Sequence, residues 1–449
     1  MKKKLVGMLF TVVMVSTLLA GCGKSSTSKD TTVEKSSTDT TAKKDTDAKT
    51  SGIKITMLNT KSEIQTQFEE MAIAYEKETG VKIEVYTATG DSPSEEIAKK
   101  YAAGDAPTLI MGDPQDVAAI ALEKAVDLSG EEWASLGGNQ YGITVDGKLY
   151  SLPFCIEARG LIYNKTAIEK VTGKEFNPSS IKSMDDLQAL LDELVAGGME
   201  TPVALNKEDW SLAAHYLTLV YEEQDGTNAT TSKFIDGLYA GTENLGKNTR
   251  FNAVMDTFDM LKKYNMNKSD PLAADIELNA AAIAEGDIAF WFHGNWAWTI
   301  LEEYVEDGTE MGIMPVVQND TTGNANVNTY LCGSATKQIM IDKVCSTPEQ
   351  QKAAKDFLNW LVNSEKGQDF LVNVCNVVPA FSNIKLEVKN PLGISVQNCV
   401  ENGQLFDGYI YYPGDHWKEV GASMQKYLAD QITRDELATE ITNYWDALK

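Results

Sequence analysis

The residues best suited to hold a ligand gather in one stretch, IAFWFHGNWAW at positions 288–298, which contains three of the chain's eight Trp residues. A Trp ring offers a flat apolar face and one N–H donor, so it suits a ligand that is apolar on one side and polar at its edge. A sugar ring is such a ligand, because its C–H face stacks on an aromatic plane while its hydroxyls take hydrogen bonds. A buried strand would also be rich in rings, and Trp291 and Trp298 fit that interpretation better.

Local signatures of catalysis or metal binding are absent from the sequence. It contains no His-Glu-x-x-His, no Gly-x-Ser-x-Gly and no Asp-rich calcium loop. The Cys residues beyond Cys22 are widely spaced, without a Cys-x-x-Cys pair, so neither a zinc site nor a disulfide framework is indicated. We therefore expect no catalytic residue, no metal and no cofactor. A glycoside hydrolase stays an alternative, because its two carboxylates need no local motif.

Charge and composition narrow the class of partner. The 449 residues include 40 Lys+Arg and 65 Asp+Glu, which gives a formal charge of −25. So acidic a surface repels phosphate backbones, and we expect no nucleic acid partner. Arg and His are scarce, with three residues of each. Because Arg forks grip carboxylates and phosphates and His clusters hold metals, the ligand is expected to be uncharged.

The first residues indicate export and a membrane anchor. Residues 1–21 combine three Lys with a mostly apolar run that is too short for a comfortable membrane span. The run ends in LAGC, which resembles the bacterial lipobox and implies a diacylglyceryl group on Cys22. Residues 22–52 are mostly Ser, Thr, Lys and Asp, a composition that predicts a flexible tether. The protein is thus expected on the extracellular face of the cell membrane, held by its lipid.

The rest of the chain alternates predicted strands and helices. Strand patterns at 53–58, 81–85 and 108–111 are separated by helical patterns at 68–78 and 95–103. This β-α-β-α-β order predicts an α/β fold with mostly parallel sheets covered by helices. Later helices are predicted to begin at Ser183 and at Thr347, where a capping box precedes a long amphipathic segment.

Six segments in the same order resemble one family. The stretch at 288–298 resembles the F/N-G-x-W-A-W signature of the extracellular solute-binding proteins of ABC importers, in the sugar-binding family that includes maltose- and maltodextrin-binding proteins. The other segments are YEKETGVKIEV at 75–85, AAGDAPTLI at 102–110, LPFCIEARGLIYNK at 152–165, EDW at 208–210 and FLNWLVNSEKG at 357–367. The resemblance runs from about residue 53 to residue 379 and more loosely beyond.

The resemblance implies the two-lobed fold of type II periplasmic binding proteins, in which the ligand closes a cleft between lobes joined by a hinge. Each lobe is expected to be a mostly parallel sheet flanked by helices. Lobe 1 would comprise residues 53–155 and 331–378, and lobe 2 residues 156–330 and 379–449.

The resemblance also implies roles for individual residues. Glu157 and Glu208 would accept hydrogen bonds from sugar hydroxyls, and Trp210 and Trp296 would stack on sugar rings. Trp417 is a looser candidate for a third platform. The remaining candidates for ligand contact are Lys61, Asp113, Asp116, Arg159, His293, Asn295 and Tyr330. Two departures from the family pattern leave the sugar open: no Trp follows the third strand, and Arg159 replaces an apolar residue.

These features together predict a monomeric lipoprotein that captures an oligosaccharide and hands it to the transmembrane subunits of an ABC permease. Maltodextrin-like α-glucans are favoured by the resemblance, whereas xylo-, fructo- and galacto-oligosaccharides stay open. Two rival interpretations are a surface glycoside hydrolase and a protein of the same fold that binds ferric iron or a polyamine.

Overall fold

The computed structural model describes residues 52–88, 93–408 and 411–449. All of these residues belong to one compact unit. The predicted export signal, the lipidation site at Cys22 and the tether up to residue 51 lie outside the described residues. In this described part, none of the helices has the length and apolar character needed to cross a membrane.

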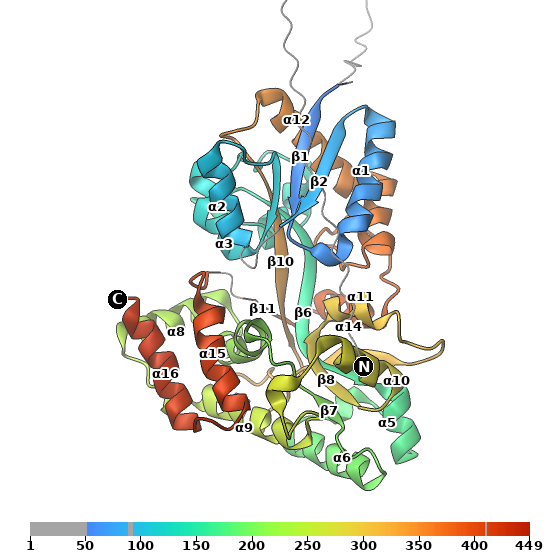
Figure 1. Cartoon of the computed structure of the whole chain (residues 1–449), viewed down its shortest axis with the longest axis vertical. Coiled ribbons are helices and arrows are strands. Elements are labelled where there is room, and N and C mark those ends of the chain that lie inside the picture. The colour runs from blue at the N-terminus through green and yellow to red at the C-terminus, as the bar shows by residue number, and fades with distance from the viewer. Residues whose placement is uncertain (1–51, 89–92, 409–410) are drawn as a thin grey trace, which may run out of the picture. The chain divides into compact units, whose positions relative to one another are not determined.

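The first elements form the predicted β-α-β-α-β unit (Figure 1). Their bounds are β1 Lys54–Asn59, α1 Gln65–Thr79, β2 Lys82–Thr87, α2 Pro93–Ala103 and β3 Leu109–Gly112. Gly80 ends α1 in the left-handed conformation, with φ 79°, which Gly adopts at little cost. β1 pairs in parallel with both β2 and β3, as the sequence pattern predicts.

Nine strands of the described chain form one sheet, in which β2-β1-β3-β10-β6-β8-β7 follow one another. The remaining strands of this sheet are β6 Leu152–Asn164, β7 Val203–Ala204, β8 Phe290–Gly294, β9 Met311–Met314, β10 Leu331–Ile341 and β11 Leu405–Asp407. The outer pairs are parallel, as expected, but β10 runs antiparallel to β3 and β6, and β6 runs antiparallel to β8 and β9. The sheet is therefore mixed at its centre.

β6 and β10 connect two groups of elements. Figure 1 shows them running from α1, α2, α3 and α12 toward α5, α6 and α9. The predicted lobe boundaries fall on these strands or beside them, because residues 155 and 156 lie in β6, β10 begins at Leu331, and Val378 bridges to Ile156. The assignment of residues to lobes stays a prediction.

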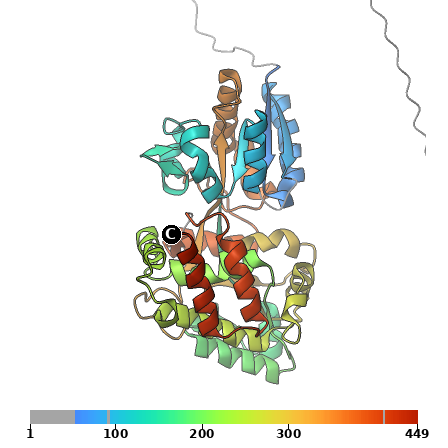
Figure 2. The same ribbon diagram turned by 60° about the vertical axis from the view of Figure 1, so that its left-hand side comes forward.

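Helices cover both faces of the sheet. The predicted caps are confirmed, since Ser183 accepts a hydrogen bond at the start of α6 and Thr347 forms a capping box at the start of α12. Figure 2 shows α15 and α16, in red, side by side. The main helices are α3 Pro114–Lys124, α5 Lys165–Thr172, α6 Met184–Ala196, α7 Thr218–Glu222, α8 Asn228–Ala240, α9 Thr249–Tyr264, α10 Ile276–Glu285, α11 Trp298–Leu301, α12 Pro348–Asn363, α14 Pro391–Glu401, α15 His416–Leu428 and α16 Arg434–Ala447.

Near the C-terminal end of β6, neighbouring residues enter different hydrophobic cores. Ile162 packs into a core shared with α1, α10 and α12, whereas Leu161 packs into one shared with α6, α9 and α15. This alternation is the period-two pattern of a strand covered on both faces. Trp291 is fully buried in the first core, as its sequence context indicates. The two cores fix β6, and the side chains near its middle are therefore held in place.

Candidate functional site

A cavity of about 190 Å³ lies where residues from six separate parts of the chain converge. We call it the Trp417 cavity. It lies between the N-terminus of α3, the centres of β6 and β10, the segment that begins at Trp210, and the start of α15. Its lining residues are Asp113, Pro114, Gln115, Arg159, Ala214, His215, Glu222, Ser334, Thr336, Gly408, Tyr412, Pro413, His416 and Trp417.

A bulge in β10 brings Thr336 into the cavity wall. Along β6, Ile156 pairs with Ala335 and Cys155 with Lys337, so Thr336 has no opposite residue. Such an extra residue bends the strand and changes the direction of its side chain. The Thr336 hydroxyl donates a hydrogen bond to Glu157 Oε2. The bulge therefore links the cavity wall to the Glu157 carboxylate.

Glu157 is a buried carboxylate, with 6% of its surface exposed. Lys61, in the segment after β1, reaches Glu157 Oε1 with its Nζ at 2.7 Å and Glu63 Oε1 at 2.6 Å. Burial acts to lower the pKa of Lys61, but the charges of Glu157 and Glu63 raise it above its usual value. Lys61 is therefore charged, and this ion pair joins the segment after β1 to β6.

A second charged group lies at the N-terminus of α3. Lys337, one residue beyond the bulge, pairs with Asp113. The neighbouring carboxyl of Asp116 has its pKa raised to about 7, first by burial and then by the charge of Asp113. Asp116 thus titrates close to neutral pH.

Arg159 is held inside the cavity wall by three hydrogen bonds. Its Nε donates to the carbonyl oxygen of His215 at 2.7 Å, and its Nη2 donates to Thr218 Oγ1 at 2.9 Å and to Glu222 Oε2 at 2.5 Å. The Tyr412 hydroxyl donates to the other oxygen of Glu222 at 3.1 Å. Burial acts to lower the pKa of Arg159, whereas the Glu222 carboxylate raises it. The guanidinium therefore joins β6 to the helical segment and, through Glu222, to the segment before α15.

The segment Trp210–Leu217 is a π-helix. Wider helical turns of this kind are rare and frequently occur at functional sites. The segment carries Trp210 at its start and His215 near its end. Because Arg159 binds the His215 carbonyl, this unusual backbone is tied directly to β6.

Aromatic rings surround His215. Its ring centroid lies 4.8 Å from that of Trp296 and 5.3 Å from that of Trp210, and the His293 ring lies 5.8 Å from Trp210 and 5.3 Å from Trp296. Burial lowers the pKa of His215 well below its usual value and that of His293 to about 3, so both imidazoles are uncharged. His215 Nδ1 is buried without a hydrogen-bond partner among the described residues. The rings form a neutral, mostly apolar surface next to the cavity.

The structure brings most of the predicted site residues together. Asp113, Arg159 and Trp417 line the cavity. Lys61 and Glu157 are linked to the cavity by hydrogen bonds, because Glu157 binds both Lys61 and the lining residue Thr336. Asp116 lies beside Asp113. The rings of Trp210 and Trp296 contact the lining residue His215, and the His293 ring contacts both of these Trp rings.

Three predicted residues are placed differently. The Asn295 side chain accepts a hydrogen bond from the Ala158 backbone N–H at 2.9 Å. Tyr330 packs on Phe406, with ring centroids 5.1 Å apart. Glu208 lies two residues before Trp210, and its Oε2 is buried without a partner in the described part of the chain. None of the three is among the residues that line the cavity, and their roles in binding stay predictions.

Sequence reasoning missed His215, Glu222, Thr336 and Tyr412. Tyr412 stands in the YYPGDHW segment that also contains Trp417, so its neighbourhood was a usable signal. His215 and Glu222 follow Trp210 in an ordinary helical pattern, and nothing in their spacing marks them. Thr336 reaches the cavity only because of the bulge.

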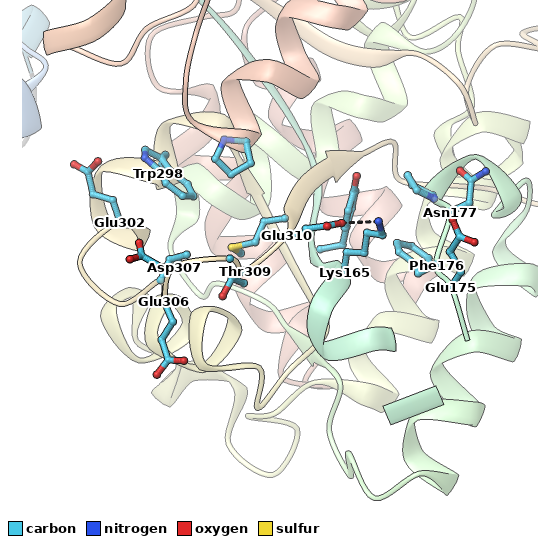
Figure 3. Close-up of a pocket in the computed structure, with 16 residues that line it drawn as sticks. Lys165, Glu175, Phe176, Asn177, Trp298, Glu302, Glu306, Asp307, Thr309 and Glu310 are labelled. Carbon is cyan, nitrogen blue, oxygen red and sulfur yellow. Dashed lines mark hydrogen bonds and ion pairs between the residues drawn. The ribbon is translucent and has the colours of Figure 1, made fainter. Parts of the chain in front are cut away.

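A larger groove of about 800 Å³ lies elsewhere, and Figure 3 shows it. We call it the acidic groove. Trp298 and Glu302 lie at one end of the view and Phe176 and Asn177 at the other. Lys165 pairs with Glu310 at 2.5 Å between them. The acidic residues that line it are Glu175, Glu302, Glu306, Asp307 and Glu310. Within residues 52–88, 93–408 and 411–449, no three His, Cys, Asp or Glu side chains gather so as to hold a metal ion.

The fold is that of the two-lobed, type II solute-binding proteins. The structure of SBP RafE in complex with raffinose matches 88% of this chain and 100% of its own, with a TM-score of 0.72 and 19% identity. A sugar transporter from Bacillus licheniformis in complex with stachyose matches 88% of this chain and 100% of its own, with a TM-score of 0.67 and 18% identity. At these identities the likeness shows the fold alone.

The chain belongs to the family of bacterial extracellular solute-binding proteins, whose model matches residues 59–368. The family predicted from the sequence motifs is thus confirmed. The "Multiple sugar-binding protein" of Streptococcus mutans is 27% identical over 224 residues, which cover 48% of this chain and 47% of that protein. The chain therefore spans about half the length of this curated relative.

Proposed function

We propose that this protein captures a neutral oligosaccharide in the Trp417 cavity and delivers it to the permease of an ABC importer. The main support for this proposal is that aromatic rings and buried ion pairs lie together at one cavity. Trp417 lines it, and Trp210 and Trp296 lie against His215 in its wall. Family membership and the sugars named for relatives with this fold support the same conclusion.

The two kinds of side chain would bind different parts of a sugar. The aromatic faces take the C–H face of a ring. The carboxylates of Glu157 and Asp113, held by Lys61 and Lys337, accept hydrogen bonds from hydroxyls, and bonds to charged acceptors are stronger than bonds to neutral ones. A sugar with a misplaced hydroxyl would leave a buried polar group unpaired, at a cost of about 1–3 kcal/mol.

Ligand binding would favour closure of the lobes. In the predicted division, Asp113 and Thr336 belong to lobe 1, whereas Arg159, His215 and Trp417 belong to lobe 2. A sugar that contacts both sets stabilises the closed form relative to the open one. The permease would recognise this form of the monomer, and a lipid on Cys22 would keep it at the outer face of the cell membrane.

The identity of the sugar is open to a direct test. The sequence resemblance favours α-glucans, while the solved relatives are named for raffinose, stachyose and chitin oligosaccharide. We would titrate the purified protein calorimetrically with maltotetraose, xylotetraose, a fructo-oligosaccharide, raffinose, stachyose and chitotetraose. Binding heat with at least one neutral sugar that is recovered intact is the expected result. The absence of heat with every sugar would contradict the proposal.

A glycoside hydrolase is the second candidate. The observation that favours it is Asp116, a carboxyl with a raised pKa beside the carboxylate of Asp113, because glycosidases pair a protonated acid with an ionised one. Chromatography of each sugar mixture after prolonged incubation separates the candidates. Recovery of intact sugar is expected of a binding protein, and shorter products that disappear in Asp116→Asn would indicate hydrolysis.

A further inference from the structure

Arg159 is a cation in the wall of a cavity for which we propose neutral sugars. It lines the Trp417 cavity together with His215 and Trp417. A guanidinium exposed in such a cavity would bind a carboxylate in a two-pronged fashion and would favour acidic sugars. Arg159 could bind a ligand carboxylate in this manner only if its charge were not already paired within the protein.

The charge of Arg159 is paired with that of Glu222. Its carboxylate is 2% exposed and lies 2.5 Å from Arg159 Nη2. The Tyr412 hydroxyl binds the other carboxylate oxygen, and Thr218 and the His215 carbonyl hold the rest of the guanidinium edge. Of the three guanidinium nitrogens, Nε and Nη2 donate hydrogen bonds to described residues. The charge of Arg159 is thus neutralised inside the wall of the cavity.

The other cations near the cavity are neutralised in the same way. Lys61 is paired with Glu157 and Glu63, and Lys337 is paired with Asp113. The cavity therefore presents hydrogen-bonding groups without an unopposed positive charge among the residues that the structure describes. Specificity of this kind rests on an unfavourable interaction with the wrong ligand as much as on contacts with the right one.

We infer that Glu222 is a specificity-determining residue, which neutralises Arg159 and thereby excludes acidic sugars, such as oligosaccharides of uronic acids, from a site that accepts neutral ones. This inference rests on the proposed function and names the substrate class of the same cavity. A uronate carboxylate placed at Arg159 would meet the carboxylate of Glu222 at short range. Because Glu222 is only 2% exposed, solvent screens that repulsion weakly.

The test compares wild type with Glu222→Gln, which keeps the shape of the side chain and leaves Arg159 unopposed. The probes are the best neutral trisaccharide and trigalacturonate. We expect wild type to bind only the neutral sugar and Glu222→Gln to gain at least about tenfold in affinity for trigalacturonate, as a charge-assisted contact provides. The gain should shrink with added salt. A folded Glu222→Gln protein that still rejects trigalacturonate would overturn the inference.

A matched control keeps the change of net charge constant. Glu302→Gln removes one carboxylate from the acidic groove, which shares no lining residue with the Trp417 cavity, and should leave both affinities unchanged within about twofold. An equal gain in Glu302→Gln would attribute the effect to net charge and contradict the role of Glu222. Wild type that binds no neutral sugar at all would instead count against the proposed function.

A second variant keeps the inference testable if Glu222→Gln does not fold. Arg159→Gln removes the guanidinium beside the carboxylate of Glu222, so the cavity should now prefer cationic sugars. We expect chitosan trimer, which carries amino groups, to gain at least about tenfold relative to chitotriose. No gain, or a new affinity for trigalacturonate, would show that the Arg159–Glu222 pair does not set the charge preference.

Discussion

The Trp417 cavity and the acidic groove differ in size, charge and origin. The groove is larger, about 800 Å³ against about 190 Å³. Its lining comes mainly from segments near Tyr163–Pro178 and Trp298–Met311, and five of its residues are acidic. The cavity draws on six separate parts of the chain, and the cations in and around it are each paired with a carboxylate. Convergence of distant residues with compensated charge, rather than volume, distinguishes the candidate binding site.

The ion pairs of the two regions should differ most in their contribution to stability. Lys61→Met leaves the buried carboxylate of Glu157 unpaired and should lower the free energy of unfolding by about 3 kcal/mol or more. Lys165→Met breaks the exposed pair with Glu310 in the acidic groove and should cost much less, because solvent screens exposed ion pairs. Urea unfolding followed by circular dichroism measures both. Equal losses would contradict the difference in burial.

Substitution of Trp residues in the two regions should have different effects on sugar affinity. Trp296→Ala should weaken binding of the best sugar at least about tenfold, because it removes a stacking surface next to the cavity. Trp298→Ala, two residues away, alters the acidic groove and should leave affinity unchanged within about twofold. Calorimetric titration of both folded variants gives the comparison. A larger loss in Trp298→Ala would move the binding site to the groove.

The sequence predicted the elements that carry these residues better than it predicted their exact contacts. The parallel unit from β1 to β3 and the caps at Ser183 and Thr347 follow from local patterns, and these are confirmed. The resemblance to one family also selected Arg159 and Trp417, which line the cavity.

The structural features that the sequence did not predict depend on contacts between distant residues, which local sequence patterns do not indicate. The antiparallel centre of the sheet arises because β6 and β10 pair with strands distant in the sequence. The bulge at Thr336 is a matter of register between those two strands. The π-helix that positions His215 has the same apolar spacing as an ordinary helix over its eight residues. These features are properties of the assembled fold.

The raised pKa of Asp116, beside the cavity, should make the free energy of unfolding depend on pH. Burial raises the pKa of Asp116 to about 7 from its usual 3.8. A group with a raised folded-state pKa contributes stability that is fully present below the unfolded pKa and is lost as pH rises through the folded pKa. The stability that Asp116 contributes should therefore be lost between about pH 4 and pH 7, and Asp116→Asn should lose less stability than wild type across that window. Urea unfolding at several pH values tests this, and parallel curves would contradict it.

The smallest expected effect is the absence of imidazole titration beside the cavity. Burial keeps His215 and His293 uncharged, because it lowers the pKa of both. Their ¹⁵N signals should stay in the neutral range from pH 5 to pH 8. The chain has three His residues, so single substitutions assign the spectrum. A His215 titration with a midpoint near pH 6 would mean that its ring is solvated.

A crystal structure of the protein with the neutral sugar that binds most tightly would locate the binding site directly. We expect one sugar ring in the Trp417 cavity, within hydrogen-bond distance of the side chains around Asp113 and Arg159, next to the rings of Trp210, Trp296 and Trp417. A sugar bound in the acidic groove, with the Trp417 cavity free of ligand, would contradict it.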